Sequence, residues 1–499
     1  MDKIIIIGAG VAGMGAALDL AKAGFKVVVI EEHGLGYGSS SRNAARMGHG
    51  FHYTDLETAK TCLRASINVQ REYPGFLLEP SADSPLAHGR YFIMRNSVPS
   101  KEVVLQRYTA LQEEYCRLIK DDPRNEVFGP PDKFFRILDP SEYENLVNTE
   151  NIALGIETNE HLFRWDSFLR IMRIRLETHP NIELQEHTKV LNIKRKMEGA
   201  NRFVLETKNE NGDCVDLEAN TIVNSTWENI ELLNAGLGIV SEPRTNRLKV
   251  ILEVELPLVL HECNSMFFCF GPFGMMVNLG GGKAMITYAE ITNVEMITDL
   301  KLSEKAERLY HQGPTADEVQ HYGQLILDGI KRFIPALEKA KIVALKFGFV
   351  QTDGKLSKNL VQDPTDDYHK RVNHGVRAEQ VGLVSNPSRK LFYFKDNAQL
   401  VLQHIREFEK ADELIEQTMQ SLREQLQSEQ LQLTPKTERR SRQKLECRNI
   451  PELLASSSAE LQKELRSDIK VQASLNALSF LTGNKQPQDC ATSSNQLQI

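Results

Sequence analysis

The chain has 499 residues, and its 60 Lys and Arg against 67 Asp and Glu give a formal net charge of −7. This length predicts roughly two to four domains, and the mild acidity argues against a nucleic-acid partner. No apolar run is long enough for a transmembrane segment. The seven scattered cysteines form no CxxC pair, which argues against a disulfide framework or a metal site and favours a cytoplasmic setting.

The N-terminal residues predict a strand, a tight turn, a helix and a second strand. The β-branched run Lys3–Ile7 is the first strand, and helical spacing follows over Met14–Ala23. A second buried strand, Phe25–Ile30, ends in two acidic residues. The turn between the first strand and the helix is Gly8-Ala9-Gly10-Val11-Ala12-Gly13. Such a unit begins a parallel sheet.

This glycine pattern is typical of a dinucleotide-binding turn. Gly8 permits a sharp turn, Gly10 lets a pyrophosphate approach the backbone, and Gly13 lets helix and strand pack closely. The helix N-terminus offers N–H groups to the phosphates, and the acidic pair Glu31 and Glu32 can accept bonds from a ribose. The alternative is a tight turn followed by an incidental acid. We predict dinucleotide binding by these residues.

The middle of the chain alternates between helical and strand patterns. A Gly- and Ser-rich loop covers 34–43, helical patterns dominate Leu56–Leu118, and a Pro-punctuated region follows. A helix is expected at Ser167–Thr178. The strands expected next are Ile182–Lys194, Arg202–Glu218 and Thr221–Asn224, with a hairpin at Asn211-Gly212.

The second half predicts an antiparallel sheet, a helical region and a last βα unit. The sheet comprises Leu248–Glu255 and Ser265–Thr292, and Leu302–Leu337 is helical. The last elements are strands at Lys341–Thr352 and Leu391–Phe394 and a helix over Ala398–Glu409.

Residues 410–499 differ in composition, being rich in Gln, Ser, Glu and Lys. Two helices, Ala411–Leu433 and Ala459–Leu481, are expected on either side of the basic segment Pro435–Pro451, and Gln486–Ile499 is expected to be disordered. The basic segment is either a solvated linker or a contact for an acidic surface. We interpret the whole region as an extension that can hold a protein partner, with a C-terminal export signal as an open alternative.

Four stretches resemble the D-amino-acid oxidase superfamily of FAD-dependent oxidoreductases, which includes glycine and sarcosine oxidases. They are IIIIGAGVAGMGAALDLAKAGFKVVVIEE, SSSRNAARMGHG, TIVNSTW and LFYFKDNAQLVLQHI, in the family's order. The resemblance implies an α/β fold in which a Rossmann-like FAD-binding domain (1–60, 155–245 and 345–410) carries an α+β substrate domain (61–154 and 246–344). Residues 411–499 form a helical extension.

The resemblance also implies site residues. Ser40, Ser41, Arg42 and Asn43 would lie near the pyrophosphate or the isoalloxazine edge. Val190 would lie near the adenine, and the helix start at Asp396 and Asn397 near the flavin ring. Each also has an ordinary structural interpretation: a loop turn, a strand residue and a helix cap. The weak catalytic candidates are Arg46, His49 and Tyr288, although His49 and His52 are better explained as structural histidines.

Two departures from the family pattern leave the substrate open. Trp227 replaces the family's glycine, and Lys395 stands where a glycine-rich turn is usual. The resemblance implies oxidation of a C–N bond in a small amine or amino acid by hydride transfer to flavin N5. The alternatives are oxidation of a 2-hydroxy acid or other alcohol, or a non-catalytic FAD protein acting through its extension. An NAD-linked dehydrogenase is less favoured, because the chain inserts a long helical region after Glu32.

Overall fold

The computed structural model describes residues 3–46, 48–74, 86, 88–196, 201–240, 242–271, 273–354, 370–428 and 434–481. The chain divides into two compact units. The first comprises Met1–Arg377 and Leu383–Gln403, and the second comprises Ala378–Gly382 and His404–Ile499. No helix within the described ranges is long and apolar enough to cross a membrane.

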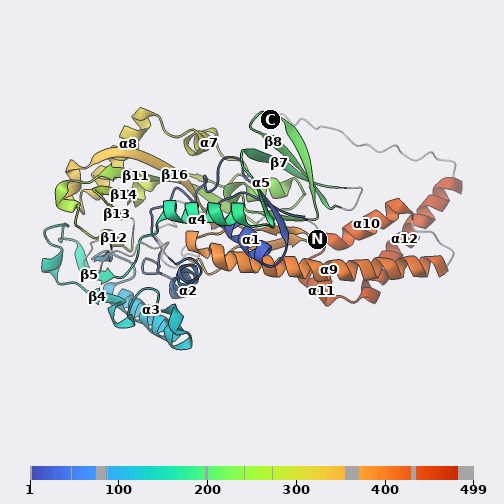
Figure 1. The fold of residues 1–499 in the computed structure, drawn as a ribbon, viewed down its shortest axis with the longest axis horizontal. Coiled ribbons are helices and arrows are strands. Elements are labelled where there is room, and N and C mark those ends of the chain that lie inside the picture. Colours follow the sequence, from blue (N-terminus) through green and yellow to red (C-terminus); the bar gives the residue numbers. More distant parts are fainter. Residues whose placement is uncertain are drawn as a thin grey trace. The chain divides into compact units, whose positions relative to one another are not determined.

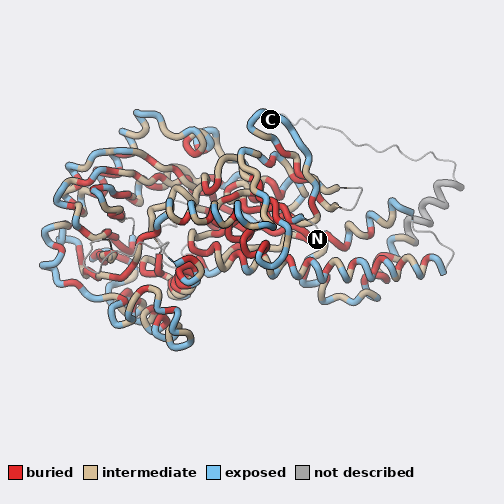
Figure 2. The backbone as a smooth tube through the Cα atoms, viewed as in Figure 1, coloured by how far each residue is buried: buried red, intermediate tan, exposed pale blue. Residues whose placement is uncertain are grey.

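The first unit contains five parallel strands in the order β18, β10, β1, β2 and β6. Their bounds are Leu383–Ser385, Thr221–Asn224, Lys3–Ile7, Lys26–Ile30 and Ile182–Gln185. The central strand β1 is followed in the chain by α1 (Val11–Lys22), the blue helix labelled in Figure 1. Four of the five residues in each of β1 and β2 are buried, as expected for β-branched strands covered on both faces. Figure 2 shows buried backbone concentrated here and in α1, which confirms the predicted N-terminal unit. A further strand, β17 (Arg377–Gln380), begins at the boundary between the units.

A small antiparallel sheet confirms the predicted hairpin. It consists of β7 (Thr188–Arg195), β8 (Phe203–Asn209) and β9 (Cys214–Ala219), each paired with the next. Gly212 lies between β8 and β9 with φ +89°, a conformation that favours glycine.

The largest sheet has the order β15-β11-β14-β13-β12-β3-β5-β4, and β16 also pairs with β11. The bounds are β3 Gly89–Met94, β4 Phe135–Ile137, β5 Ile152–Thr158, β11 Arg244–Glu255, β12 Ser265–Cys269, β13 Gly274–Gly280, β14 Lys283–Tyr288, β15 Asn293–Ile297 and β16 Lys341–Asp353. All these pairings are antiparallel except that of β12 with β3. The predicted antiparallel sheet is confirmed.

Besides α1, seven α-helices of the described part of the first unit lie along these sheets, and α9 begins at its end. The bounds are α2 Leu56–Glu72, α3 Lys101–Asp121, α4 Trp165–Thr178, α5 Ile230–Ala235, α6 Ala289–Thr292, α7 Glu304–His311, α8 Ala316–Ile330 and α9 Phe394–Ser428. The expected helices of 302–337 are α7 and α8. The helices α2 and α3 lie in the region Leu56–Leu118 where helical patterns were expected to dominate, but the strand β3 between them was not expected. A short apolar run such as Tyr91–Met94 does not distinguish strand from helix.

The expected last strand, Leu391–Phe394, is wrong. Leu391–Tyr393 forms a 3₁₀ turn that leads directly into α9, whereas the final parallel strand is β18, eight residues earlier. A buried strand of only three residues is too short to show a periodic pattern.

The second unit is helical, as predicted. It contains the continuation of α9, then α10 (Pro435–Glu446), α11 (Ile450–Ala455) and α12 (Ser458–Leu481). The basic segment forms most of α10, and its charges meet acids of α12. Lys444 lies 2.9 Å from Glu464 and 2.6 Å from Asp468, and Arg448 lies 2.9 Å from Glu464. The segment expected to be disordered, Gln486–Ile499, lies outside the described residues.

Candidate functional site

The turn between β1 and α1 excludes side chains at two of its glycines. Gly8 has φ +93°, and a Cβ atom there would lie 2.7 Å from the backbone oxygen of Ser225. A Cβ atom at Gly13 would lie 1.9 Å from the oxygen of Gly8. At Gly10 a Cβ atom would meet only the hydroxyl of Ser40, at 3.1 Å. The fold itself therefore requires Gly8 and Gly13, whereas Gly10 keeps the backbone open to the space in front of it.

The acidic pair at the end of β2 closes one side of the turn. Glu31 accepts hydrogen bonds from the backbone N–H groups of Ala9 (2.7 Å) and His33 (3.1 Å), and burial raises its pKa. Glu32 forms an ion pair with Lys189 at 2.7 Å. Glu31 thus lies against the turn, as its position in the sequence predicts.

The Ser-rich loop after β2 folds back over the N-terminus of α1. The Ser40 hydroxyl accepts from the N–H of Val11 (3.1 Å), and the Asn43 amide donates to the Ser40 carbonyl oxygen (2.6 Å). Ser41 donates to the carbonyl oxygen of Tyr37 (2.8 Å). Ser41 and Asn43 therefore stabilise the loop through local hydrogen bonds, which is the structural interpretation of these two residues.

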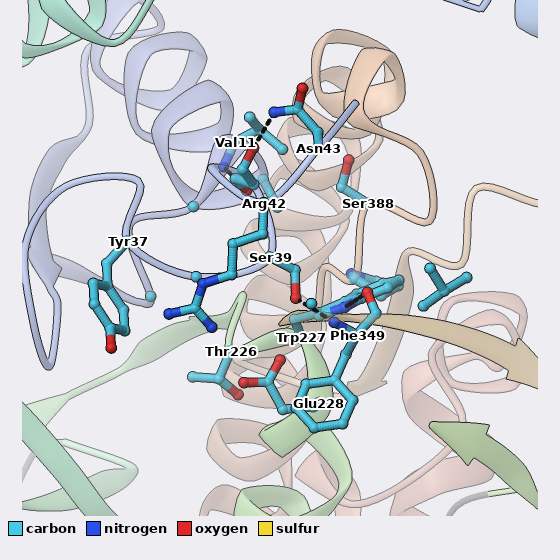
Figure 3. A pocket seen from close by; sticks show the side chains of 18 of the residues that line it. Val11, Tyr37, Ser39, Arg42, Asn43, Thr226, Trp227, Glu228, Phe349 and Ser388 are labelled. Atoms are coloured by element: carbon cyan, nitrogen blue, oxygen red, sulfur yellow. Dashed lines mark hydrogen bonds between the residues drawn. The ribbon is translucent and has the colours of Figure 1, made fainter. Parts of the chain in front are cut away.

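Arg42 differs from its neighbours because its guanidinium group faces the interior of the site (Figure 3). It lies 4.8 Å from the ring centre of Tyr37 and 4.1 Å from that of Tyr310, and it donates to the carbonyl oxygen of Phe347 at 3.2 Å. Its contacts place a positive charge between aromatic rings close to the β1–α1 turn.

The turn after β10 lies opposite this loop. Trp227 has φ +54° although it is not glycine, and its indole N–H donates to the carbonyl oxygen of Phe349 at 3.0 Å. The next residue, Glu228, is buried, and burial raises its pKa to about 8. The left-handed conformation that suits the family's glycine is thus retained by a tryptophan.

The loop between β18 and α9 forms another wall. Asn386 is completely buried, and its amide donates to the carbonyl oxygen of Ala12 at 3.1 Å. The side chains of Asn397 and Asn386 are hydrogen-bonded at 3.0 Å. Asp396 bonds instead to Asn68, at 2.8 Å. Asn397 therefore holds the loop in place from behind, and Asp396 points elsewhere.

These segments enclose one cavity of about 570 Å³, a size typical of ligand sites. The proposed site residues that line it are Gly8, Gly10, Val11, Ala12, Glu31, Glu32, Arg42, Asn43, Arg46 and Val190. The remaining ones, Ala9, Gly13, Ser41, His49, Tyr288, Asp396 and Asn397, are not in its lining. The turn, the acid pair, the Ser-rich loop and β7 are thus brought together around one space.

The cavity reaches the large sheet, where two lysines border it. Lys249 comes from β11 and Lys390 from the β18–α9 loop, and both are half-buried. Desolvation, followed by the nearby cations Arg247 and Arg371, lowers the pKa of each lysine to about 7. Among the described residues, neither lysine forms an ion pair with a carboxylate. The sheet end of the cavity is therefore positively charged at and below neutral pH.

The other candidates at this end are already engaged or uncharged. Arg46 forms an ion pair with buried Glu160 at 2.8 Å and also bonds to Tyr91. His49 is buried against Phe128, at 3.8 Å between ring centres, and burial lowers its pKa well below the usual value. Tyr288 bonds to Arg332 away from the cavity. No group of three or more His, Cys, Asp or Glu side chains in the described ranges could hold a metal ion.

Three residues of the cavity were not predicted from the sequence as site residues. Lys249 lies within a strand whose alternate residues Leu248 and Val250 face the core, so the period of two could have placed it on the opposite face. Tyr310, from α7, and Lys390 come from segments with no local signal, because the fold alone brings them to the site.

Comparisons with known proteins agree with this fold. The family profile DAO, described as FAD dependent oxidoreductase, matches residues 3–365. Solved structures with a similar fold include glycine oxidase from Geobacillus kaustophilus, with a TM-score of 0.54 and 15% identity over 81% of this chain and 95% of that one. L-amino acid deaminase from Proteus vulgaris has a TM-score of 0.55 and 12% identity, covering 81% and 93%.

Curated relatives match a short part of the chain. A subunit of the anaerobic glycerol-3-phosphate dehydrogenase of Escherichia coli (strain K12) is 39% identical over 72 residues, which are 14% of this chain and 13% of that protein. Glycerol-3-phosphate dehydrogenase of Mycobacterium leprae (strain TN) is 36% identical over 83 residues, or 17% and 14%. The matches thus span about a seventh of these relatives.

A parallel sheet with a glycine-rich βα turn, joined to an antiparallel sheet across one cavity, defines a dinucleotide-dependent oxidoreductase. The extent of the profile match identifies the particular family: the chain belongs to the DAO family of FAD-dependent oxidoreductases. Its cofactor is therefore FAD, and the expected α/β class with a helical extension is confirmed.

Proposed function

We propose that the protein oxidises the C–N bond of a small amine or amino acid that carries a carboxylate. The observation that carries the carboxylate in this proposal is the pair Lys249 and Lys390 at the sheet end of the cavity, with no carboxylate partner among the described residues. Enclosed cations without a counter-ion are costly, and perturbed groups in a cavity favour a binding role. An anionic substrate would supply the missing charge.

FAD would occupy the part of the cavity between the β1–α1 turn and the β18–α9 loop. The open backbone at Gly10, the helix N-terminus and the Arg42 guanidinium suit a pyrophosphate, and Glu31 suits a ribose. Val190, which lines the same end of the cavity, would lie against the adenine. FAD, when bound, accepts the hydride that the substrate carbon loses.

The chain's own residues would bind and orient the substrate. Lys249 and Lys390 hold its carboxylate by charge, and Ile251 and Met275 supply an apolar wall beside them. His52 stays uncharged at neutral pH, because burial lowers its pKa well below the usual value. Positioning and exclusion of water account for most of what such a protein adds to the chemistry of its cofactor.

A second candidate is oxidation of an alcohol that carries an anionic group, such as a 2-hydroxy acid. The lysine pair fits this substrate class equally well, since it recognises the anion and not the carbon that is oxidised. The names of the curated relatives, glycerol-3-phosphate dehydrogenases, favour an alcohol. Their match covers about a seventh of their length, so it is weak support for a shared substrate.

Anaerobic titration of the purified holoprotein tests the proposal. Amino acids, the corresponding decarboxylated amines and 2-hydroxy acids are added in turn while the flavin absorption is followed. Bleaching by an amino acid, with much weaker bleaching by its decarboxylated amine, is expected. Bleaching by hydroxy acids alone would move the assignment to the second candidate.

Two variants test whether Lys249 contributes to substrate binding. Lys249→Met should raise the concentration for half-bleaching at least tenfold. Lys346→Met is the matched control, because this side chain on neighbouring β16 pairs with Glu253 at 3.2 Å and does not line the cavity. Equal bleaching by amines with and without a carboxylate would contradict the argument.

A further inference from the structure

One carboxyl group faces the cavity beside the β1–α1 turn and has no role so far. Glu228 belongs to the 3₁₀ turn Trp227–Asn229, its side chain lines the cavity, and the residue is only 6% exposed. Its Oε2 atom is buried and has no hydrogen-bond partner among the described residues. A buried polar atom without a partner is costly, and this one borders a cavity that a ligand can fill.

The position of the turn gives the ligand. A Cβ atom on Gly8 would lie 2.7 Å from the backbone oxygen of Ser225, three residues before Glu228, so the two turns are in contact. Figure 3 shows Glu228 with Thr226, Ser39 and Arg42 around the same part of the cavity. This part is where the proposed placement puts the phosphate and ribityl portion of FAD.

Among the described residues, a cation and a further acid act on Glu228. Arg42 faces it from the Ser-rich loop, and Tyr310 and Glu307 face it from α7. The Tyr310 hydroxyl lies 3.2 Å from the Ser39 hydroxyl and bonds to the Glu228 carboxyl. A single guanidinium group does not offset a pyrophosphate and an additional carboxylate together.

We infer that Glu228 contacts FAD as a neutral carboxylic acid, donating a hydrogen bond from its free carboxyl oxygen to the bound cofactor, so that FAD binds more weakly at alkaline pH. The inference rests on the placement of FAD in this cavity. It assigns to the chain a cofactor-contacting residue whose protonation controls retention of the flavin.

The acid–base behaviour of the group agrees with the geometry. Burial raises the pKa of Glu228 to about 8, so the carboxyl group is mainly protonated at neutral pH. Ionisation above that pH replaces a donor by a negative charge next to the phosphates. If only the protonated form binds FAD, the dissociation constant rises up to about tenfold per pH unit above the pKa, or about thirtyfold at pH 9.5.

The test measures the dissociation constant of FAD for the apoprotein between pH 6.5 and 9.5, by quenching of flavin fluorescence. The wild-type constant should be steady to about pH 7.5 and then rise. Glu228→Gln keeps a donor but cannot ionise, so its constant should resemble that of the wild type at pH 6.5 and stay nearly flat. The ratio of the wild-type to the variant dissociation constant at each pH removes the contributions of Lys249 and Lys390, because these lysines titrate in both proteins.

Glu307→Gln is the matched control, because it removes a neighbouring carboxylate on α7 and should leave the alkaline rise intact. A wild-type constant that is flat or falls above pH 8, or an equal rise in Glu228→Gln, would overturn the inference. The wild-type profile alone can do so, whatever the variant's folding. Absence of FAD binding at every pH would instead refute the placement of FAD itself.

Discussion

Gly10 and Gly13 of the β1–α1 turn should respond differently to substitution by alanine. In Gly13→Ala the new methyl group would start 1.9 Å from the Gly8 oxygen, against 3.4 Å for ordinary contact, so the strand and helix must separate by about 1.5 Å. Overpacking of this kind costs about 1–3 kcal/mol or more, which exceeds the gain of about 1 kcal/mol in helix propensity. Gly13→Ala should therefore lower the stability of the apoprotein.

Gly10→Ala should leave stability nearly unchanged and weaken FAD binding. Its methyl group meets only the Ser40 hydroxyl at 3.1 Å, which can move by a few tenths of an ångström. The group projects where the backbone borders the cavity, so a tenfold loss of FAD affinity, about 1.4 kcal/mol, is expected. Thermal unfolding of the apoprotein and FAD titration check the two effects. Loss of stability in Gly10→Ala equal to that in Gly13→Ala, or full FAD affinity in Gly10→Ala, would refute the reasoning.

Two further predictions concern charged groups. Asp19→Ala removes the nearer carboxylate partner of the largely buried Lys395, at 2.9 Å, and leaves only Glu72 at 3.9 Å, so it should cost up to about 3 kcal/mol. Asp19→Leu with Lys395→Met should recover most of this loss in denaturant unfolding, and equal stability of the two variants would contradict the prediction. Lys249 and Lys390 lose their charge as the pH rises through about 7. The KM for a carboxylate substrate should therefore increase between pH 6 and 8. A pH-independent KM would exclude the two lysines as the groups that bind the carboxylate.

Local sequence signals predicted the elements whose structure depends on neighbouring residues. The glycine spacing, the β-branched strands β1 and β2, and the hairpin at Gly212 each follow from backbone preferences that act over a few residues. The resemblance to the family added the order of the remaining segments. The strands that were not predicted, β3 and β18, are short apolar runs whose conformation is set by the strands beside them.

Local sequence patterns predict even less of the candidate site than of the fold. Tyr310 reaches Ser39 across 271 residues of sequence, and Lys390 joins Lys249 only because the β18–α9 loop folds against β11. No pattern near any of these residues indicates its partner. The Ser-rich loop was singled out correctly as a feature of the cavity, but the hydroxyls that face α1 and β16 are Ser40 and Ser39, and not Ser41. Which side chain of a loop turns inward depends on packing that the sequence does not display.

Trp227, one of the two departures from the family pattern, lines the cavity next to Glu228. Trp227 in the left-handed conformation costs about 1–2 kcal/mol, which its hydrogen bond to Phe349 and its packing against the large sheet partly offset. A glycine there would leave this wall open and Glu228 in contact with water, where its carboxyl group would ionise near its ordinary pKa. The tryptophan therefore provides the enclosure that raises the pKa of Glu228, and a cavity with an acid at each side of the phosphate position requires the second acid to be neutral. Trp227→Gly should accordingly shift the alkaline weakening of FAD binding to lower pH, a change that FAD titration detects without reference to any substrate.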